Sequence, residues 1–140
     1  MIDDARFEAK LGGLSEYMDV IKGLLPKDQK AYVGSDIALK YAIERSLQLI
    51  SDTEFDTLAI LYKGLEIKVV GDELSMLDVL ADRMGAKLAD SLRKRRALRN
   101  RLVHAYASSS YDKDVFQQAH NLDDVRDFIR EVKKLASHPK

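Results

Sequence analysis

The chain has 140 residues, of which 46 % are hydrophobic and 33 % are charged, with 23 basic and 23 acidic side chains. This length predicts one domain over residues 1–140 with a real core, and the balanced charge excludes a global field that would attract nucleic acid. The absence of cysteine excludes disulfides, thiolate nucleophiles and cysteine metal sites. The N-terminus is acidic and lacks the apolar stretch of a signal peptide, and no apolar run approaches the ~20 residues of a membrane span, so we expect a cytoplasmic protein.

The first predicted element is a helix between residues 7 and 25, where apolar side chains recur every three or four positions. Asp3 or Asp4 is expected to cap its start. Gly12 and Gly13 lie inside this helix, and each weakens it by roughly 1 kcal/mol relative to alanine. They mark either a close helix contact or a tolerated weak position.

The second predicted helix runs from about residue 29 to beyond residue 50, and as far as residue 62. Its apolar side chains lie on more than one face, which indicates packing on several sides, as at the centre of a bundle or in a dimer interface. Glu44 and Arg45 interrupt this pattern. We expect them to form a solvated edge, and the alternative is that one of them faces the basic segment described below and orients it.

The rest of the chain predicts further helices with short connections. A helical pattern over residues 55–65 is followed by a connection at 67–70, and Ser75 with Asp78 resembles a capping box for a helix that Gly85 ends. Helices are then expected from residue 86 to about 106, from Asp112, and from the segment 121–124 onward, where an acidic cap precedes an apolar stripe. The predicted fold is an all-α, up-and-down bundle of five to six helices.

A basic segment forms the end of the helix that starts at residue 86. It contains no acid and includes one of the three histidines of the chain, and its members are Arg93, Lys94, Arg95, Arg96, Arg99, Arg101 and His104. Arginine holds an anion and histidine moves protons near neutral pH, so these residue types suit phosphate chemistry without a metal. At ~100° per residue, Arg95 and Arg99 share the apolar face of this helix with Leu102 and Tyr106. A buried arginine needs a partner, so we expect Arg99 at the mouth of a pocket or at a subunit interface.

His104 lies five residues after Arg99, roughly 140° further around an ideal helix. The two side chains therefore do not lie side by side on one straight helix, whereas Asn100 and His104 share a face. Either the helix bends near His104, or two chains meet across a two-fold axis and place two arginines and two histidines around one cleft.

The residues Arg99, Asn100, His104 and Tyr106 resemble the Arg-x4-His-x-Tyr motif of the HEPN superfamily, and most closely its HepT branch of toxin–antitoxin proteins. Residues 41–48 resemble the central helix of that family, residues 76–81 the segment before the motif helix, and residues 112–132 the closing helices. The chain departs from the family at 108–110, where three serines replace a segment that is apolar and acidic in many relatives. This departure concerns the rim of the cleft.

The resemblance implies a HEPN-like, homodimeric, metal-independent endoribonuclease toxin of a type VII toxin–antitoxin system. It implies that Arg99 and His104 are catalytic and that Asn100 supports them. Its partner would be a nucleotidyltransferase antitoxin of the MNT type, which neutralises the toxin by adding AMP to Tyr106. The substrate would be RNA, either tRNA or mRNA, with no cofactor, no metal, no DNA and no membrane.

Simpler interpretations stay open beside these. Four basic residues are expected to form a face that is solvated or contacts the RNA backbone: Arg93, Arg95, Arg96 and Arg101. Tyr106 could be a plain core residue, and His120 and His138 lack the spacing of metal ligands. An alternative function is a non-catalytic helical partner of a minimal nucleotidyltransferase, which needs Arg99 for nucleotide phosphates and does not need His104. A purely structural dimerisation bundle would need neither.

Overall fold

The computed structural model describes residues 2–69, 71–104 and 109–137. Its regular structure is helical throughout these residues. It consists of α1 (Asp4–Leu24), α2 (Gln29–Val33), α3 (Ile37–Gly64), α4 (Glu73–Met84), α5 (Ala86–His104), the 3-10 turn η1 (Ser109–Tyr111), α6 (Asp112–His120) and α7 (Asp123–Ser137). The all-α class expected from the sequence is confirmed, with seven α-helices in the described residues where five or six were expected.

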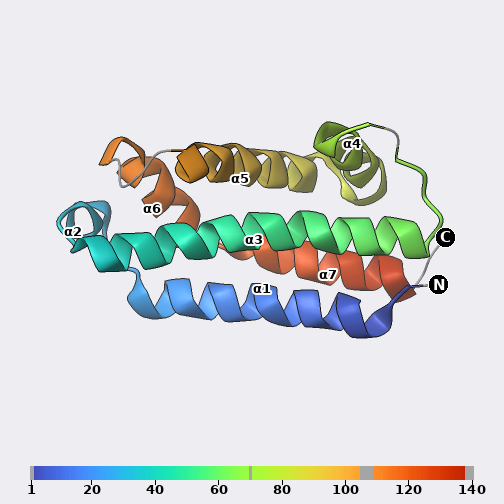
Figure 1. Ribbon diagram of the computed structural model, residues 1–140, viewed down its shortest axis with the longest axis horizontal. Helices are drawn as coiled ribbons and strands as arrows, with labels where there is room; N and C mark the ends of the chain where they lie inside the picture. Colours follow the sequence, from blue (N-terminus) through green and yellow to red (C-terminus); the bar gives the residue numbers. More distant parts are fainter. Residues whose placement is uncertain (1, 70, 105–108, 138–140) are drawn as a thin grey trace.

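Helix α3 is the longest element, with 28 residues, and it runs through the middle of the molecule. Figure 1 shows α1, α5 and α7 lying along it, with successive long helices pointing in opposite directions. The short helices α2 and α6 close the end where α5 finishes, and α4 lies at the end where α5 begins. This arrangement confirms the up-and-down bundle and places α3 against the basic helix α5.

The first helix forms as expected. The side chain of Asp3 accepts a hydrogen bond from the backbone N–H of Arg6 at 3.2 Å, which caps the start. Its buried stripe extends from Phe7 to Ile21 and faces the core. A Cβ added at Gly12 would meet no atom within 4 Å, so this glycine does not serve a close helix contact and is a tolerated weak position.

The single helix expected from about residue 29 to residue 62 is divided into α2 and α3 in the structure. Gly34 ends α2, and the side chain of Asp36 accepts a hydrogen bond from the backbone N–H of Leu39 at 2.9 Å, which starts α3. An aspartate competes well for a helix start because its carboxylate satisfies backbone donors that otherwise lack partners. The short α2 buries Tyr32 completely against the core. Helix α3 then continues to Gly64, so the helical pattern of residues 55–65 belongs to it.

The expected cap at Ser75 is wrong. The N-cap of α4 is Asp72, whose side chain accepts a hydrogen bond from the backbone N–H of Leu74 at 3.1 Å, and Ser75 lies in the first turn. The charged carboxylate is the stronger acceptor at a helix start, where the helix dipole favours negative charge. Gly85 ends α4 as expected, at φ 101°, a conformation that favours glycine.

The last two helices begin where the sequence predicts. Helix α6 starts at Asp112, and the side chain of Asn121 accepts a hydrogen bond from the backbone N–H of Asp123 at 3.1 Å, at the start of α7. Residues 67–69 form the expected connection between α3 and α4. No helix in the described parts of the chain is long and apolar enough to cross a membrane.

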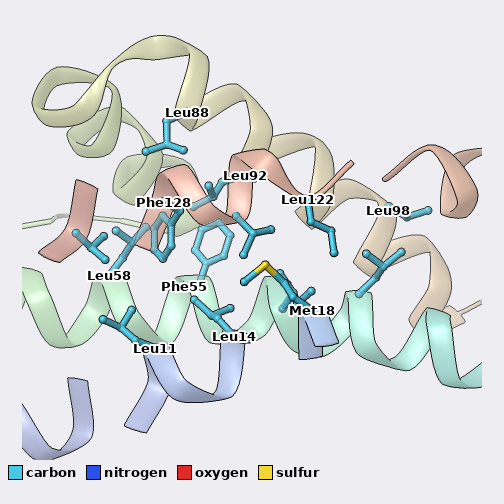
Figure 2. Close-up of a cluster of buried hydrophobic side chains, with 14 of the residues drawn as sticks. Leu11, Leu14, Met18, Phe55, Leu58, Leu88, Leu92, Leu98, Leu122 and Phe128 are labelled. Carbon is cyan, nitrogen blue, oxygen red and sulfur yellow. The ribbon is translucent and has the colours of Figure 1, made fainter. Parts of the chain in front are cut away.

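The core lies between the four long helices (Figure 2). It joins side chains of α1, α3, α5 and α7 with Leu122 from the short link before α7. The labelled members are Leu11, Leu14, Met18, Phe55, Leu58, Leu88, Leu92, Leu98, Leu122 and Phe128. Helix α5 contributes four leucines to the core, Leu88, Leu92, Leu98 and Leu102. Packing therefore fixes one face of this helix, and its basic side chains are distributed around the rest.

Candidate active site

The arginines of α5 have very different surroundings. Helix α5 buries one face in the core, and that face consists of Leu88, Ala89, Leu92, Arg95, Leu98 and Leu102. Arg95 is 2 % exposed, in agreement with the expectation that it falls on the apolar face. Arg93 and Arg101 are exposed on the other side of the helix. Arg96 and Arg99 lie between these extremes.

Arg95 is fully engaged by two carboxylates. It donates from Nε and Nη2 to the two carboxylate oxygens of Glu54 at 2.8 and 2.9 Å, and from Nη1 to Asp124 at 3.2 and 3.3 Å. Burial raises the pKa of Glu54, an effect that Arg95 opposes. The structure therefore does not place Arg95 on a surface that RNA could contact. Its guanidinium joins α3, α5 and α7 inside the molecule.

Arg96 is also held by two carboxylates, at the edge of the bundle. It donates from Nε to Glu73 at 3.0 Å and from Nη2 to the other oxygen of the same carboxylate. Its Nη1 donates to Oδ1 of Asp52 at 2.6 Å. The guanidinium also lies over the ring of Phe55, 4.7 Å from its centroid. Arg96 thus links α3, α4 and α5.

Arg99 contacts fewer carboxylates than Arg95 and Arg96 do. Its Nε lies 2.8 Å from Oδ1 of Asp52, the same oxygen that Arg96 contacts. The Nε–H bond does not point at this oxygen, so the contact is an ion pair rather than a linear hydrogen bond. Nη1 donates to Oδ1 of Asn100 at 3.3 Å. The side chain is 29 % exposed, so Arg99 lies at the surface as part of a shared ion pair, and its partner comes from α3.

The catalytic pair expected from the sequence is not brought together on one helix. His104 is the last residue of α5 and is exposed. Helix α5 stays α-helical through His104, so the side chains of Arg99 and His104 leave it roughly 140° apart. Asn100 is exposed on the face that it shares with His104. The expected modification site, Tyr106, lies outside the described residues.

The two outer arginines have weaker partners. Arg93 forms an exposed ion pair with Asp90 one turn earlier in α5. Arg101 lies 3.9 Å from Asp114 and over the ring of Tyr111, 5.5 Å from its centroid. Exposed ion pairs of this kind contribute about 0–1 kcal/mol. Both guanidinium groups are therefore available to an anion in solution.

A cleft of about 290 Å³ lies between α4 and α5, beside this group of arginines. Its α5 side includes Arg93, Arg96 and Asn100, and its α4 side includes Glu73 and Leu74. Leu74 is an exposed apolar residue. The cleft therefore combines donors on one wall with a carboxylate and an apolar surface on the other.

A second polar cluster joins α2, α3 and α6. Lys40 donates to Oδ2 of Asp112 at 2.9 Å, and Tyr32 lies below this pair. Glu44 is 7 % exposed, so its expected place on a solvated edge is wrong, whereas Arg45 is exposed as expected. Burial raises the pKa of Glu44, Asp112 raises it further, and Lys40 opposes both. The cluster fixes the start of α6, the helix that follows the motif segment.

Sequence reasoning missed the acidic partners of the arginines. These are Asp52, Glu54 and Asp124, with Glu73 from α4. One of them carried a signal, because Glu54 falls in the apolar stripe formed by Leu47, Ile50, Leu58 and Leu61 of α3. An acid in one apolar stripe and an arginine in another indicate a buried pair. Asp52 lies off that stripe, and only the packing of α3 on α5 reveals its role.

No group of three or more histidine, aspartate and glutamate side chains in the described ranges is arranged to hold a metal ion. Exposed His120, the other histidine in those ranges, stacks on Phe116 with ring centroids 5.4 Å apart. It lies in α6, on an element separate from the arginines of α5. The described polar side chains at the end of α5 are those of Arg99, Asn100, Arg101 and His104.

Comparisons with known proteins agree with this fold. A crystal structure of a toxin-antitoxin with AMP-PNP is similar, with a TM-score of 0.82 and 20 % sequence identity over 93 % of this chain and 98 % of that chain. No curated protein sequence matches the chain. The family model of HepT-like ribonucleases matches residues 14–132, which include all of α3, α4, α5 and α6. This match covers most of the chain, and the chain therefore belongs to the HepT-like ribonuclease family.

Proposed function

We propose that the chain is a metal-independent endoribonuclease toxin of a type VII toxin–antitoxin system, with Arg99 and His104 as the catalytic pair and Asn100 in support. The observation that carries this proposal is the contrast among the arginines of α5. Arg95 and Arg96 each hold two carboxylates, whereas Arg99 shares one and stays partly exposed. A guanidinium that lacks a carboxylate of its own retains donors for a phosphate. Membership of a ribonuclease family supports the assignment.

The site is completed by a second copy of the chain. Arg99 and His104 diverge on one helix, so a single copy does not place both beside one phosphate. A two-fold axis near the end of α5 would set Arg99 opposite His104 of the partner subunit and bring the two histidines into one cleft. The homodimer is therefore part of the proposed mechanism.

The reaction is an internal transesterification of RNA. His104 of one subunit takes the proton of the ribose 2′-hydroxyl, and the 2′-oxygen forms a bond to the adjacent phosphorus. Arg99 stabilises the negative charge that develops on the phosphate oxygens. The bond from phosphorus to the 5′-oxygen breaks, and the partner's His104 donates a proton to that oxygen. The products are a 2′,3′-cyclic phosphate and a free 5′-hydroxyl, and no metal or cofactor is consumed.

Substrate binding would use the outer face of α5. Arg93 and Arg101 are exposed and only weakly paired, so they suit contacts to the backbone of tRNA or mRNA. Arg96 borders the cleft beside Asn100, but its Nε, Nη1 and Nη2 are bound to Glu73 and Asp52, so it is left out of this surface, contrary to the expectation from the sequence. Arg95 is left out of this surface because its guanidinium is buried and paired.

Neutralisation is proposed to occur by transfer of AMP to Tyr106 from a nucleotidyltransferase antitoxin of the MNT type. The tyrosine oxygen would form a bond to the α-phosphorus of ATP, pyrophosphate would leave, and the phenolic proton would pass to a base. The similarity to a toxin-antitoxin structure with AMP-PNP supports an adenine nucleotide in such a system. An AMP group two residues beyond His104 would add bulk and negative charge where RNA must enter.

The test is cleavage of a labelled RNA by the purified protein in EDTA, compared with the variants His104→Ala and Arg99→Ala. General acid–base catalysis contributes about 10²- to 10⁴-fold, so His104→Ala is expected to lower kcat by at least about 100-fold. The product ends are checked for 2′,3′-cyclic phosphate by their resistance to phosphatase before acid treatment. Cleavage that requires an added divalent metal would refute the mechanism.

His120→Ala is the matched control, because it removes an exposed histidine from the end of another helix. It is expected to cleave at the wild-type rate. The alternative function, a non-catalytic nucleotide-binding or dimerisation partner, predicts a different pattern. In that case His104→Ala would behave as wild type, and only Arg99→Ala would weaken the binding of a nucleotide beside α5.

A further inference from the structure

The side chain of Asp52 is shared by two arginines of the neighbouring helix. Its Oδ1 lies 2.6 Å from Nη1 of Arg96 and 2.8 Å from Nε of Arg99. Asp52 comes from α3, and Figure 1 shows this helix running alongside α5 in the opposite direction. One carboxylate oxygen therefore lies between two guanidinium groups that are one helical turn apart.

The carboxylate of Asp52 is fixed independently of Arg99. Arg96 donates two hydrogen bonds to Glu73 of α4 and stacks on Phe55 of α3, so its own guanidinium has little freedom. Its hydrogen bond to Asp52 then holds that carboxylate in place. Asp52 is thus braced by a chain of contacts that runs from α4 through α5 to α3.

The contact with Asp52 engages one side of Arg99. The Nε edge lies against the carboxylate, and Nη1 donates to the neighbouring Asn100. Within the described part of the chain no side chain accepts a hydrogen bond from Nη2. Oδ1 of Asp52 also accepts a hydrogen bond from Arg96, so the negative charge of Asp52 is shared between two arginines. Asp52 therefore neutralises only part of the positive charge of Arg99. Arg99 is therefore oriented, and it keeps donors and positive charge for an anion.

We infer that Asp52 is a positioning residue for the reaction, which fixes the guanidinium of Arg99 in the orientation that receives the RNA phosphate. This inference rests on the proposed function, in which Arg99 stabilises the transition state. Asp52 touches neither the substrate nor the reacting atoms. It acts through Arg99, and its own orientation depends on Arg96.

The test compares Asp52→Asn with Asp56→Asn in steady-state RNA cleavage. Asp56 lies one turn further along α3 and pairs with Lys10 of α1 at 3.1 Å, so its replacement removes the same charge from the same helix without touching α5. A misplacement near 1 Å costs up to about 100-fold in rate, so we expect Asp52→Asn to lower kcat by about 10- to 100-fold with a much smaller change in KM. Asp56→Asn is expected to keep both constants within about twofold of wild type.

A third variant separates orientation from folding and charge. Asp52→Glu keeps the carboxylate and its link to Arg96 but displaces it by one methylene. A positioning role predicts that this variant melts near the wild-type temperature and still loses kcat. If Asp52→Asn and Asp52→Glu both cleave within about twofold of wild type, the positioning role is refuted.

A measurement on Arg99 itself does not depend on RNA cleavage. The ¹⁵Nε relaxation of Arg99, assigned with Arg99→Lys, reports the rigidity of its side chain on the ps–ns timescale. We expect a rigid signal in wild type and Asp56→Asn and a mobile one in Asp52→Asn. If wild type fails to cleave RNA, the proposed function fails, and this relaxation measurement still decides whether Asp52 holds Arg99. Unchanged rigidity in Asp52→Asn would overturn the inference.

Discussion

At the residue scale, the arginines of α5 differ in their carboxylate partners rather than in their own chemistry. Arg95 has two carboxylates in the interior, and Arg99 shares one at the surface. Placing an ion in the interior costs several kcal/mol unless partners compensate. Arg95 therefore serves structure, whereas Arg99 keeps donors that could bind an anion, as the proposed function requires.

Replacing Arg95 by methionine should reveal this structural role. The change leaves Glu54, which is 0 % exposed, without the bidentate partner that lowers its pKa. Breaking a buried pair in this way costs about 3–5 kcal/mol, so we expect a loss of that size in the free energy of unfolding in urea at pH 7. The exposed Arg93→Met is expected to stay within about 0.5 kcal/mol of wild type. An Arg95→Met protein as stable as Arg93→Met would refute the structural role.

The same variant should show a defined pH dependence. Burial already raises the pKa of Glu54, and loss of Arg95 raises it further. A carboxyl group with a raised folded-state pKa favours folding below its unfolded pKa and loses that contribution as the pH rises through the folded-state value. The deficit of Arg95→Met relative to wild type is therefore expected to be smaller at about pH 4 than at pH 7.

At the element scale, glycines of two long helices lie in opposite environments. A Cβ at Gly12 of α1 would meet no atom within 4 Å, whereas a Cβ at Gly64, the last residue of α3, would lie 2.6 Å from the Cα of Ile2. The first position carries only the entropic cost of glycine in a helix. The second allows the N-terminal segment to cross the end of α3.

The two alanine variants should therefore change stability in opposite directions. Gly12→Ala is expected to raise the free energy of unfolding by about 0.5–1 kcal/mol, because alanine restricts the unfolded chain and fits the helix. Gly64→Ala is expected to lower it, because the new methyl group collides with backbone atoms. Urea denaturation of both variants beside wild type decides the matter, and stabilisation by Gly64→Ala would contradict the close approach of residue 2.

At the scale of the whole molecule, charge is balanced and much of it is paired. The formal net charge is zero at pH 7, and Arg95 and Arg96 are bound to carboxylates of three other helices. Under the proposed function, the cations that bind RNA would be those on the outer side and at the end of α5. Binding of RNA would thus depend on a local patch and not on the overall field.

The salt dependence of RNA binding checks this view. For single-stranded RNA, the logarithm of the association constant falls with the logarithm of the salt concentration, with a slope of about −0.7 for each phosphate neutralised. Arg101→Gln is therefore expected to make this slope less steep by about 0.7. Lys10→Gln changes a cation of α1, which lies across α3 from α5 in Figure 1, and should leave the slope unchanged. Fluorescence anisotropy with the His104→Ala background avoids cleavage during the titration. Equal slopes for the two variants would place the RNA elsewhere.

The sequence predicted the helices well where a periodic apolar stripe and a cap agreed. The stripe from Phe7 to Ile21, the start of α6 and the end of α4 at Gly85 follow the expectations. The prediction failed at two helix starts. Asp36 caps α3 where one continuous helix was expected, and Asp72 caps α4 where Ser75 was expected to be the cap. Several nearby residues could cap each of these helices, and periodicity alone does not rank them.

By itself, the sequence determined the all-helical class, the basic helix α5, the position of Arg95 on the apolar face of that helix and the divergence of Arg99 from His104, because these depend on helical period alone. It also placed Arg95 among the arginines that contact RNA, which was wrong, because Glu54 and Asp124 bind its guanidinium in the interior. The tertiary structure decided which carboxylates meet those arginines. Glu54 and Asp124 lie 41 and 29 residues away from Arg95 along the sequence, and Asp52 is similarly distant from Arg99. Such distant pairs depend on the register of one helix against another, and packing of the whole core sets that register.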